Sequence, residues 1–284
     1  MSITFLGDCC LDVNVVRGEP REEIGGGVYH GAVTACRLGA QVRVISKARH
    51  RDRRRFAEIE QAGAVVTWLS SASSTSIRND YPSDNADDRI SRVISRAEPF
   101  TLAEVEGLEA DVLHINPLWM GMVPPTLLPA LRQRSRVLAA DAQGFSRVVA
   151  PDGTAAHTPW TRAPDYLHLL DVLKVDIVEA HTLTGLDDPR EAAVSLLAQG
   201  VGTVLLTHHR GVLAARGAEL REAPWGAWTL EGRTGRGDTC TAAFLVGLQR
   251  GDALADALDL AARVTSEKMQ YRGPYRGSGS PSGA

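Results

Sequence analysis

The stretch Gly232-Arg233-Thr234-Gly235-Arg236-Gly237-Asp238-Thr239-Cys240 places two glycines and a carboxylate directly before an apolar run, Ala242 to Leu248. This order predicts a loop that leads into the N-terminus of a helix. Gly235 and Gly237 can adopt positive φ and leave room for a ligand, so backbone N–H groups can converge on an anion at the positive end of the helix dipole. Asp238 would then be placed to accept a proton from a hydroxyl that attacks a phosphoryl group. From these residues alone, a plain turn with Asp238 as N-cap is an equal alternative.

The composition is that of an ordinary globular protein, with 284 residues of which 44% are hydrophobic. A net charge of −3 and a pI near 6.2 argue against a nucleic-acid or membrane-surface binder, which usually has a basic excess. The chain starts without a basic segment followed by a long apolar stretch, and its four cysteines have neither zinc nor disulfide spacing. We therefore expect a cytoplasmic protein with no nucleic-acid or membrane partner.

Short β-rich runs alternate with amphipathic stretches along the chain. The runs are Ile3–Leu6, Val42–Ile45, Val65–Leu69, Val112–Ile115, Val137–Ala140, Val175–Val178, Val204–Thr207 and Val212–Ala215. The amphipathic stretches are Tyr29–Leu38, Arg53–Ala62, Pro125–Arg134 and Pro189–Gln199. This alternation predicts an α/β fold with a mainly parallel sheet flanked by helices on both faces. Active sites of such sheets lie at the carboxyl ends of the strands.

Two segments differ from this pattern. Residues 70–96 are polar and turn-rich, with Pro82-Ser83-Asp84-Asn85 at the centre, and predict a small β lid. From Asp238 to about Met269 the pattern is helical and breaks at Arg250-Gly251-Asp252, which predicts two helices after the glycine loop. We expect one domain over residues 1–276, including the lid, and a flexible tail at 277–284.

Three further segments carry candidate site residues. Gly25-Gly26-Gly27-Val28-Tyr29-His30 opens a helix that is followed by Leu38-Gly39, and such glycines let a ligand approach the backbone closely. In Asp176-Ile177-Val178-Glu179, two carboxylates three residues apart share a face of a first helical turn and suit a hard cation such as Mg²⁺. Asp12 follows the first strand, where a carboxylate can bind substrate hydroxyls. For Tyr29 and His30, core packing is as good an explanation as ligand contact.

Together these segments resemble the ribokinase (PfkB) family of small-molecule kinases. The family's Thr-Gly-Ala-Gly-Asp core is similar to Thr234-Gly235-Arg236-Gly237-Asp238, its N-terminal glycine pair to Gly25-Gly26, and its Asn-x-x-Glu motif to Asp176 through Glu179. The order of these motifs agrees over nearly the whole chain. The resemblance implies a ribokinase-like fold and ATP-dependent phosphorylation of a small alcohol, which could be a sugar, an inositol or other polyol, or a nucleoside.

The resemblance also implies roles for individual residues. Asp238 would be the general base, and the backbone of Gly235, Arg236 and Gly237 would form the anion hole. Asp176 and Glu179 would hold Mg²⁺ through water. The substrate would contact Asp12, Gly26, Gly27, His30, Asn116 and Asp238. ATP would lie over Thr207, Gly211, Thr234, Gly235 and Gly237. Members of the family often dimerise through the lid, so a homodimer is an open alternative.

The chain also departs from the family pattern. His30 stands where many members have an asparagine that touches the sugar, and Arg236 replaces a small alanine, so that it either reaches the phosphates or points to solvent. Asp176 replaces asparagine, and the glycine expected after Thr207 is missing, which puts the adenine pocket in doubt. Two functions therefore stay open: an active kinase, favoured by the intact Asp238, and a binding protein of this fold without turnover.

Overall fold

The computed structural model describes residues 2–16, 18–81, 90–227, 229 and 232–277. Its main sheet has nine strands in the order β15-β14-β13-β12-β9-β8-β1-β4-β5. The bounds are β1 Ser2–Gly7, β4 Gln41–Ala48, β5 Val65–Ser70, β8 Ala110–Asn116, β9 Ser135–Asp141, β12 Val172–Asp176, β13 Thr203–Thr207, β14 Gly211–Arg216 and β15 Glu219–Pro224. All neighbouring strands from β13 to β5 pair in parallel, while β14 and β15 form an antiparallel edge. The predicted α/β sheet is confirmed.

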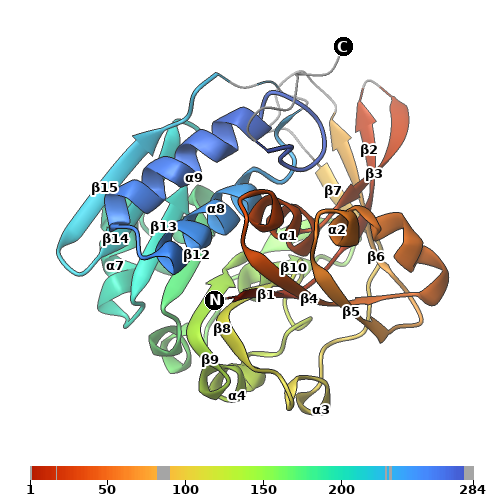
Figure 1. Cartoon of the computed structure of the whole chain (residues 1–284), viewed down its shortest axis with the longest axis horizontal. Helices are drawn as coiled ribbons and strands as arrows, with labels where there is room; N and C mark the ends of the chain where they lie inside the picture. The colour runs from red at the N-terminus through yellow and green to blue at the C-terminus, as the bar shows by residue number, and fades with distance from the viewer. Residues whose placement is uncertain (1, 17, 82–89, 228, 230–231, 278–284) are drawn as a thin grey trace.

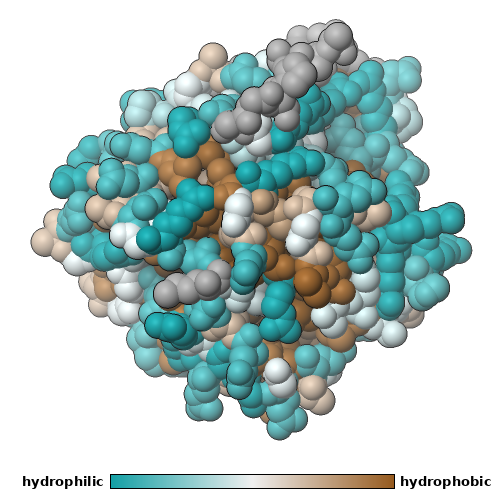
Figure 2. Space-filling view, in the orientation of Figure 1, coloured by the Kyte–Doolittle hydropathy of each residue, from teal (hydrophilic) through white to brown (hydrophobic). Residues whose placement is uncertain are grey.

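Helices cover both faces of this sheet (Figure 1). One face packs against α1 (Gly27–Arg37), α2 (Glu58–Gln61), α8 (Arg236–Arg250) and α9 (Leu254–Lys268), and the other against α3 (Leu102–Val105), α4 (Leu128–Gln133), α6 (Ile177–Thr184) and α7 (Pro189–Ala198). Adjacent strand residues point to opposite faces, so Phe5 belongs to the first core and Leu6 to the second. Figure 2 shows one side of the molecule, where hydrophilic side chains cover most of the surface and hydrophobic ones are visible in a band across the middle.

A second sheet of four strands, in the order β3-β2-β6-β7, forms the lid. Its strands are β2 (Cys10–Val16), β3 (Glu19–Gly25), β6 (Thr75–Tyr81) and β7 (Ile90–Ser95). Residues 70–96 supply β6 and β7 as predicted, and the predicted turn Pro82–Asn85 lies outside the described residues. The other half, β2 and β3, is not among the predicted strands; β3 gives no apolar alternation because its segment Glu19-Pro20-Arg21-Glu22-Glu23 is charged.

The buried carboxyl of Asp8 joins the lid to the main sheet. Thr75 Oγ1 at the start of β6 donates to Asp8 Oδ1 over 2.5 Å, and the N–H of Leu118, after β8, donates to Asp8 Oδ2 over 2.8 Å. Burial raises the pKa of Asp8, while both hydrogen bonds act in the opposite direction. The lid is thus tied to the edge where β1 and β8 end.

Several predicted boundaries shift for local reasons. The strand expected over Val175–Val178 ends at Asp176, because Asp176 caps α6 in a reciprocal capping box with Glu179. The helix expected over Arg53–Ala62 is a 3₁₀ segment, His50–Phe56, followed by the single turn α2. The two C-terminal helices are confirmed, and they separate at Gly251, which has φ +87°. The remaining elements are α5 (Gln143–Ser146), β10 (Arg147–Val149), β11 (Ala155–His157) and 3₁₀ turns Pro125–Leu127, Ala163–Asp165 and Leu167–Leu169. Among the described helices, none is both long and apolar enough to cross a membrane.

Candidate active site

Polar residues end four neighbouring strands at one edge of the main sheet. Asn116 ends β8, Asp141 ends β9, Asp176 ends β12 and Thr207 ends β13, while α8 begins opposite them. A cavity of about 170 Å³ lies between this edge, the start of α8 and the lid. Its lining includes all the predicted site residues except Asn116, Glu179 and Gly211.

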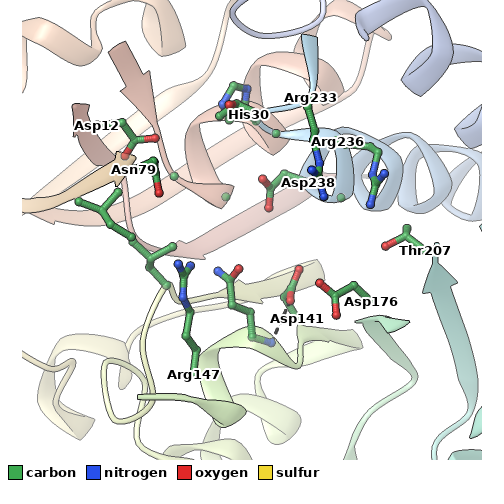
Figure 3. Close-up of a pocket in the computed structure, with 18 of the residues that line it drawn as sticks. Asp12, His30, Asn79, Asp141, Arg147, Asp176, Thr207, Arg233, Arg236 and Asp238 are labelled. Carbon is green, nitrogen blue, oxygen red and sulfur yellow. Dashed lines mark hydrogen bonds between the residues drawn. The ribbon is translucent and has the colours of Figure 1, made fainter. Parts of the chain in front are cut away.

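Asp238 lies in the first turn of α8, with its carboxylate in the cavity (Figure 3). Asn116 Nδ2 donates to Asp238 Oδ1 over 3.0 Å, so Asn116 contributes by orienting the carboxylate although it does not line the cavity. Asp238 also lines the cavity, where a ligand can reach its carboxylate. A carboxylate held in this way is suited to accept a proton from a bound hydroxyl.

The helix begins after Gly235, whose φ of +79° lies in the left-handed region. A Cβ at this position would lie 2.4 Å from Cγ of His30, so glycine is required by space as well as by conformation. His30 is 1% exposed, and burial, assisted by the charge of Lys268, lowers its pKa to about 3. The neutral imidazole of His30 therefore supports the glycine loop from α1 and reaches the edge of the cavity.

The expected anion hole needs one correction. The backbone N–H of Arg236 donates to the carbonyl of Arg233 over 3.1 Å, so this group is occupied by the turn. Arg236 instead contributes its side chain, which lines the cavity together with that of Arg233 (Figure 3). Both guanidinium groups lie on the side of Asp238 that faces Thr207, which favours the phosphate-directed alternative for Arg236.

Beneath the start of α8 lies a buried charged cluster. Lys174 on β12 is 6% exposed, and its Nζ lies 3.2 Å from Asp141 Oδ2 and 3.5 Å from Glu179 Oε2. Burial raises the pKa of Asp141 and of Glu179, whereas Lys174, despite its burial, has a raised pKa because carboxylates surround it. A Cβ on Gly237 would lie 3.2 Å from this ammonium, so Lys174 stands directly below the glycine loop.

The predicted magnesium ligands differ in position. Asp176 lines the cavity, while Glu179 is 1% exposed and lies behind it. Glu179 Oε2 accepts from Asp176 N over 2.7 Å, and Asp176 Oδ1 accepts from Glu179 N over 2.8 Å. The two carboxylates therefore cap the N-terminus of α6. Within the described part of the chain no three acidic, His or Cys side chains converge as a metal site. These residues therefore fit a cation that is held by the carboxylate of Asp176, by water and by ligand oxygens. Glu179 would not bind the cation itself but would position Asp176 and Lys174.

The other half of the cavity lies under the lid. Asp12 on β2 and Asn79 on β6 face Arg147 across this space (Figure 3). The guanidinium of Arg147 stacks on Trp119 at 4.8 Å from the ring centre, which holds it in place. Asn79 Nδ2 donates to Asn14 Oδ1 over 2.9 Å, and Asn79 Oδ1 accepts from Ser91 Oγ over 2.7 Å. This half offers a carboxylate, an amide and a guanidinium, which together suit a ligand rich in hydroxyl groups.

The glycines at the start of α1 allow this close assembly. Gly26 has φ +91°, and a Cβ there would lie 2.5 Å from the carbonyl oxygen of Asp8. A Cβ on Gly27 would lie 2.2 Å from Asn116 Oδ1 and would displace the amide that orients Asp238. Both glycines line the cavity as predicted.

The expected nucleotide turn is only partly at the cavity. Thr207 lines it, whereas Gly211 lies outside, where a Cβ would meet the carbonyl of Ala223 at 2.3 Å. Several backbone groups of the turn bond within the protein: His208 N donates to Gly211 O, and Trp225 donates through N to Arg210 O and through Nε1 to His208 O. Gly211 is thus required by packing against β15.

The predicted site residues do not include Asn79, Asp141, Arg147, Lys174 and Arg233, which also line the cavity. One of them has a signal in the sequence, since Val172-Leu173-Lys174-Val175 places a charge inside an otherwise apolar strand. The others lie on the lid strand β6, at the end of β9, at the start of β10 and in the loop before α8, where polar residues are normal.

Comparisons with known proteins agree with this geometry. The model of the pfkB family carbohydrate kinases matches residues 97–280. A pyrophosphate-dependent kinase in the ribokinase family, solved with a pyrophosphate analog and myo-inositol, is 43% identical, with 96% of this chain and 97% of that one covered and a TM-score of 0.91. A pyrophosphate-dependent myo-inositol-1 kinase, converted into a myo-inositol-3 kinase by exchanging an asparagine and a serine for leucine, is 42% identical, with 96% and 95% covered and a TM-score of 0.90. Ribokinase of Arabidopsis thaliana shares the fold at 17% identity, with 96% and 94% covered and a TM-score of 0.73. No curated protein sequence matches this chain.

The fold and the site thus define a small-molecule kinase that phosphorylates an alcohol. The chain belongs to the pfkB family of carbohydrate kinases. Kinases of this family use a phosphate donor together with a divalent metal.

Proposed function

We propose that this chain transfers a phosphoryl group from pyrophosphate to a hydroxyl of an inositol. The observation that carries the proposal is the division of one small cavity into a half lined by the two arginines Arg233 and Arg236 and a hydroxyl-binding half lined by Asp12 and Arg147. Asp238 lies between the two. The two pyrophosphate-dependent relatives described above are associated with myo-inositol, one by its bound ligand and the other by its activity.

One feature favours pyrophosphate over the expected ATP as donor. In the turn where an adenine would be expected, the backbone N–H and carbonyl groups of His208 and Arg210 already have partners within the protein. Two arginines can bind the oxygens of a small, highly charged donor from separate directions.

The chemistry then follows from the positions of the side chains. Asp238, oriented by Asn116, accepts the proton of the attacking hydroxyl. The hydroxyl oxygen bonds to the nearer phosphorus, the bridging P–O bond breaks, and phosphate leaves toward Arg233 and Arg236. A divalent cation at Asp176 would neutralise charge on the donor oxygens. The positive end of α8 and the arginines stabilise the charge that spreads over the transferred group.

The donor and the acceptor are tested together. Purified protein with Mg²⁺ is given pyrophosphate or ATP as donor, and myo-inositol, ribose, fructose or a nucleoside as acceptor, and products are followed by ³¹P NMR. We expect inositol monophosphate and free phosphate from pyrophosphate with myo-inositol. Turnover with ATP alone would overturn the donor assignment, and turnover restricted to sugars or nucleosides would overturn the acceptor.

The role of Asp238 has its own test. Asp238→Asn should lower kcat by ~10²–10⁴-fold, because the amide cannot accept the proton, while pyrophosphate still binds in calorimetry. Asp252→Asn is the matched control, since Asp252 follows the other end of α8, far from the cavity lining. Equal turnover in the two variants would show that Asp238 is not the general base.

The hydroxyl that reacts is proposed to depend on Asn79 and Ser91. These two side chains form one hydrogen-bonded pair in the lid, and Asn79 lines the cavity. The relative that acts at the 1-position changes to the 3-position when an asparagine and a serine become leucine. Asn79→Leu combined with Ser91→Leu should therefore shift the product from one inositol monophosphate to the other, and an unchanged product by chiral analysis would contradict this. A homodimer through the lid remains a proposal for solution measurements.

A further inference from the structure

Lys268, the last residue of α9, is a fully buried cation outside the cavity lining. Its Nζ donates to the carbonyl of Gly232 over 2.5 Å and to the carbonyl of Thr234. Both carbonyls belong to the segment that leads into α8. An ammonium group has thus been taken out of water to bind the backbone of the glycine loop.

This burial is unfavourable by itself. Removing an ammonium from water costs several kcal/mol even after relaxation, and a methionine of similar length would fill the space without that cost. Burial lowers the pKa of Lys268 to about 8, while Asp238 and Glu23 act in the opposite direction. A lysine here therefore needs a reason other than packing.

The direction of the carbonyls supplies the reason. A trans peptide is planar, so the N–H of each residue points opposite to the carbonyl before it. Because the carbonyl of Thr234 faces Lys268, the N–H of Gly235 points away from Lys268, on the side where Thr234 and Gly235 line the cavity. Turning this one peptide would remove a donor from the anion site.

Neighbouring contacts hold the end of α9 against the same segment. The carbonyl of Met269 accepts from Thr229 N over 3.0 Å and from Thr229 Oγ1 over 3.1 Å. A Cβ on Gly232 would lie 2.0 Å from that carbonyl oxygen, so only a glycine lets the loop segment pass this close to the end of α9. The end of α9 is therefore packed directly against the entrance of the loop.

We propose that Lys268 is a positioning residue for phosphoryl transfer, a fixed internal cation that orients the peptides of the glycine loop so that the N–H of Gly235 faces the transferred group. Lys268 touches neither donor nor acceptor. The inference rests on the transfer chemistry proposed for Asp238. Loss of Lys268 should lower kcat. A misdirected N–H of Gly235 stabilises the transition state less, whereas binding of the acceptor substrate does not depend on it.

The test uses a neutral variant and a cavity variant of the full chain. Lys268→Met should still fold, with a Tm lowered by the two carbonyls that lose their donor, and should lose ~10²-fold in kcat while it keeps its KM for the acceptor. Lys268→Ala should regain at least about tenfold in kcat when ethylammonium is added, but not with ethanol, which has the size without the charge. Lys47→Met is the matched control: Lys47 is 3% exposed and donates to the carbonyl of Pro99, away from the site, so only its Tm should change.

The outcomes separate this inference from the proposed function. The assay uses whichever donor and acceptor give turnover in the unaltered chain. Loss of kcat in Lys268→Met together with rescue of Lys268→Ala by ethylammonium supports the positioning role. Retention of kcat within about threefold in Lys268→Met, or absence of rescue, overturns it. If Asp238→Asn is inactive while Lys268→Met is not, only the role of Lys268 fails.

Discussion

Replacing Gly235 by alanine should lower both stability and turnover, for two reasons that can be separated. At φ +79° an alanine costs ~1–2 kcal/mol relative to the right-handed region. In addition, its Cβ would lie 2.4 Å from Cγ of His30, where ordinary contacts begin at 3.4 Å. The loop and the imidazole must therefore separate by about 1 Å, and a misplacement of that size can lower turnover by ~10²-fold.

Gly251→Ala provides the matched control. Gly251 caps the other end of the same helix with φ +87°, and nothing lies within 4 Å of the point that a Cβ would occupy there. Both variants should lose similar free energy of unfolding from the backbone, measured by urea titration, but only Gly235→Ala should lose kcat. Adding His30→Ala to Gly235→Ala should restore part of the lost turnover. The reasoning is refuted if Gly251→Ala loses as much kcat, or if Gly235→Ala keeps kcat within about threefold.

Two further predictions concern stability. Burial lowers the pKa of His30 and of His114 to about 3, so only the unfolded chain binds these protons between about pH 6.5 and 3. The free energy of unfolding that these histidines contribute is fully present above about pH 6.5 and falls by about 2 kcal/mol per histidine from pH 7 to 5. His114→Leu should remove about half of this loss in urea titrations. An unchanged loss would contradict the prediction. Thr75→Val should lower the free energy of unfolding by about 1–3 kcal/mol, because the buried carboxyl of Asp8 loses a donor; an unaltered unfolding midpoint would show that this bond does not hold the lid.

The lid illustrates what sequence patterns miss. The polar alternation of residues 70–96 predicts β6 and β7, but β3 is charged along most of its length, and nothing local reveals that it pairs with β2. The parallel pairing of β2 with β6 joins segments more than sixty residues apart, a distance over which periodicity carries no information. The sequence therefore predicts Asp12 just after the first strand of the main sheet, whereas Asp12 lies on a lid strand and reaches the cavity from the lid.

The cluster around Lys174 shows a second limit. The spacing of Asp176 and Glu179 predicts that their carboxylates share a cation, but spacing says nothing about other strands. The fold brings Lys174 and Asp141 from neighbouring strands to the same point, so that Glu179 faces an ammonium and only Asp176 faces the cavity. Strand order, which the sequence does not state, decides which of two equivalent carboxylates is available.

The sequence by itself determined the alternation of strands and helices, the glycine loop before α8 and the carboxylate within it, because these depend on residues close together in the chain. Only the tertiary structure decided what surrounds that loop. It placed the imidazole of His30 against Gly235, the amide of Asn116 on Asp238 and the ammonium of Lys268 on the loop carbonyls. These contacts join distant segments, and their geometry depends on packing that local patterns do not encode.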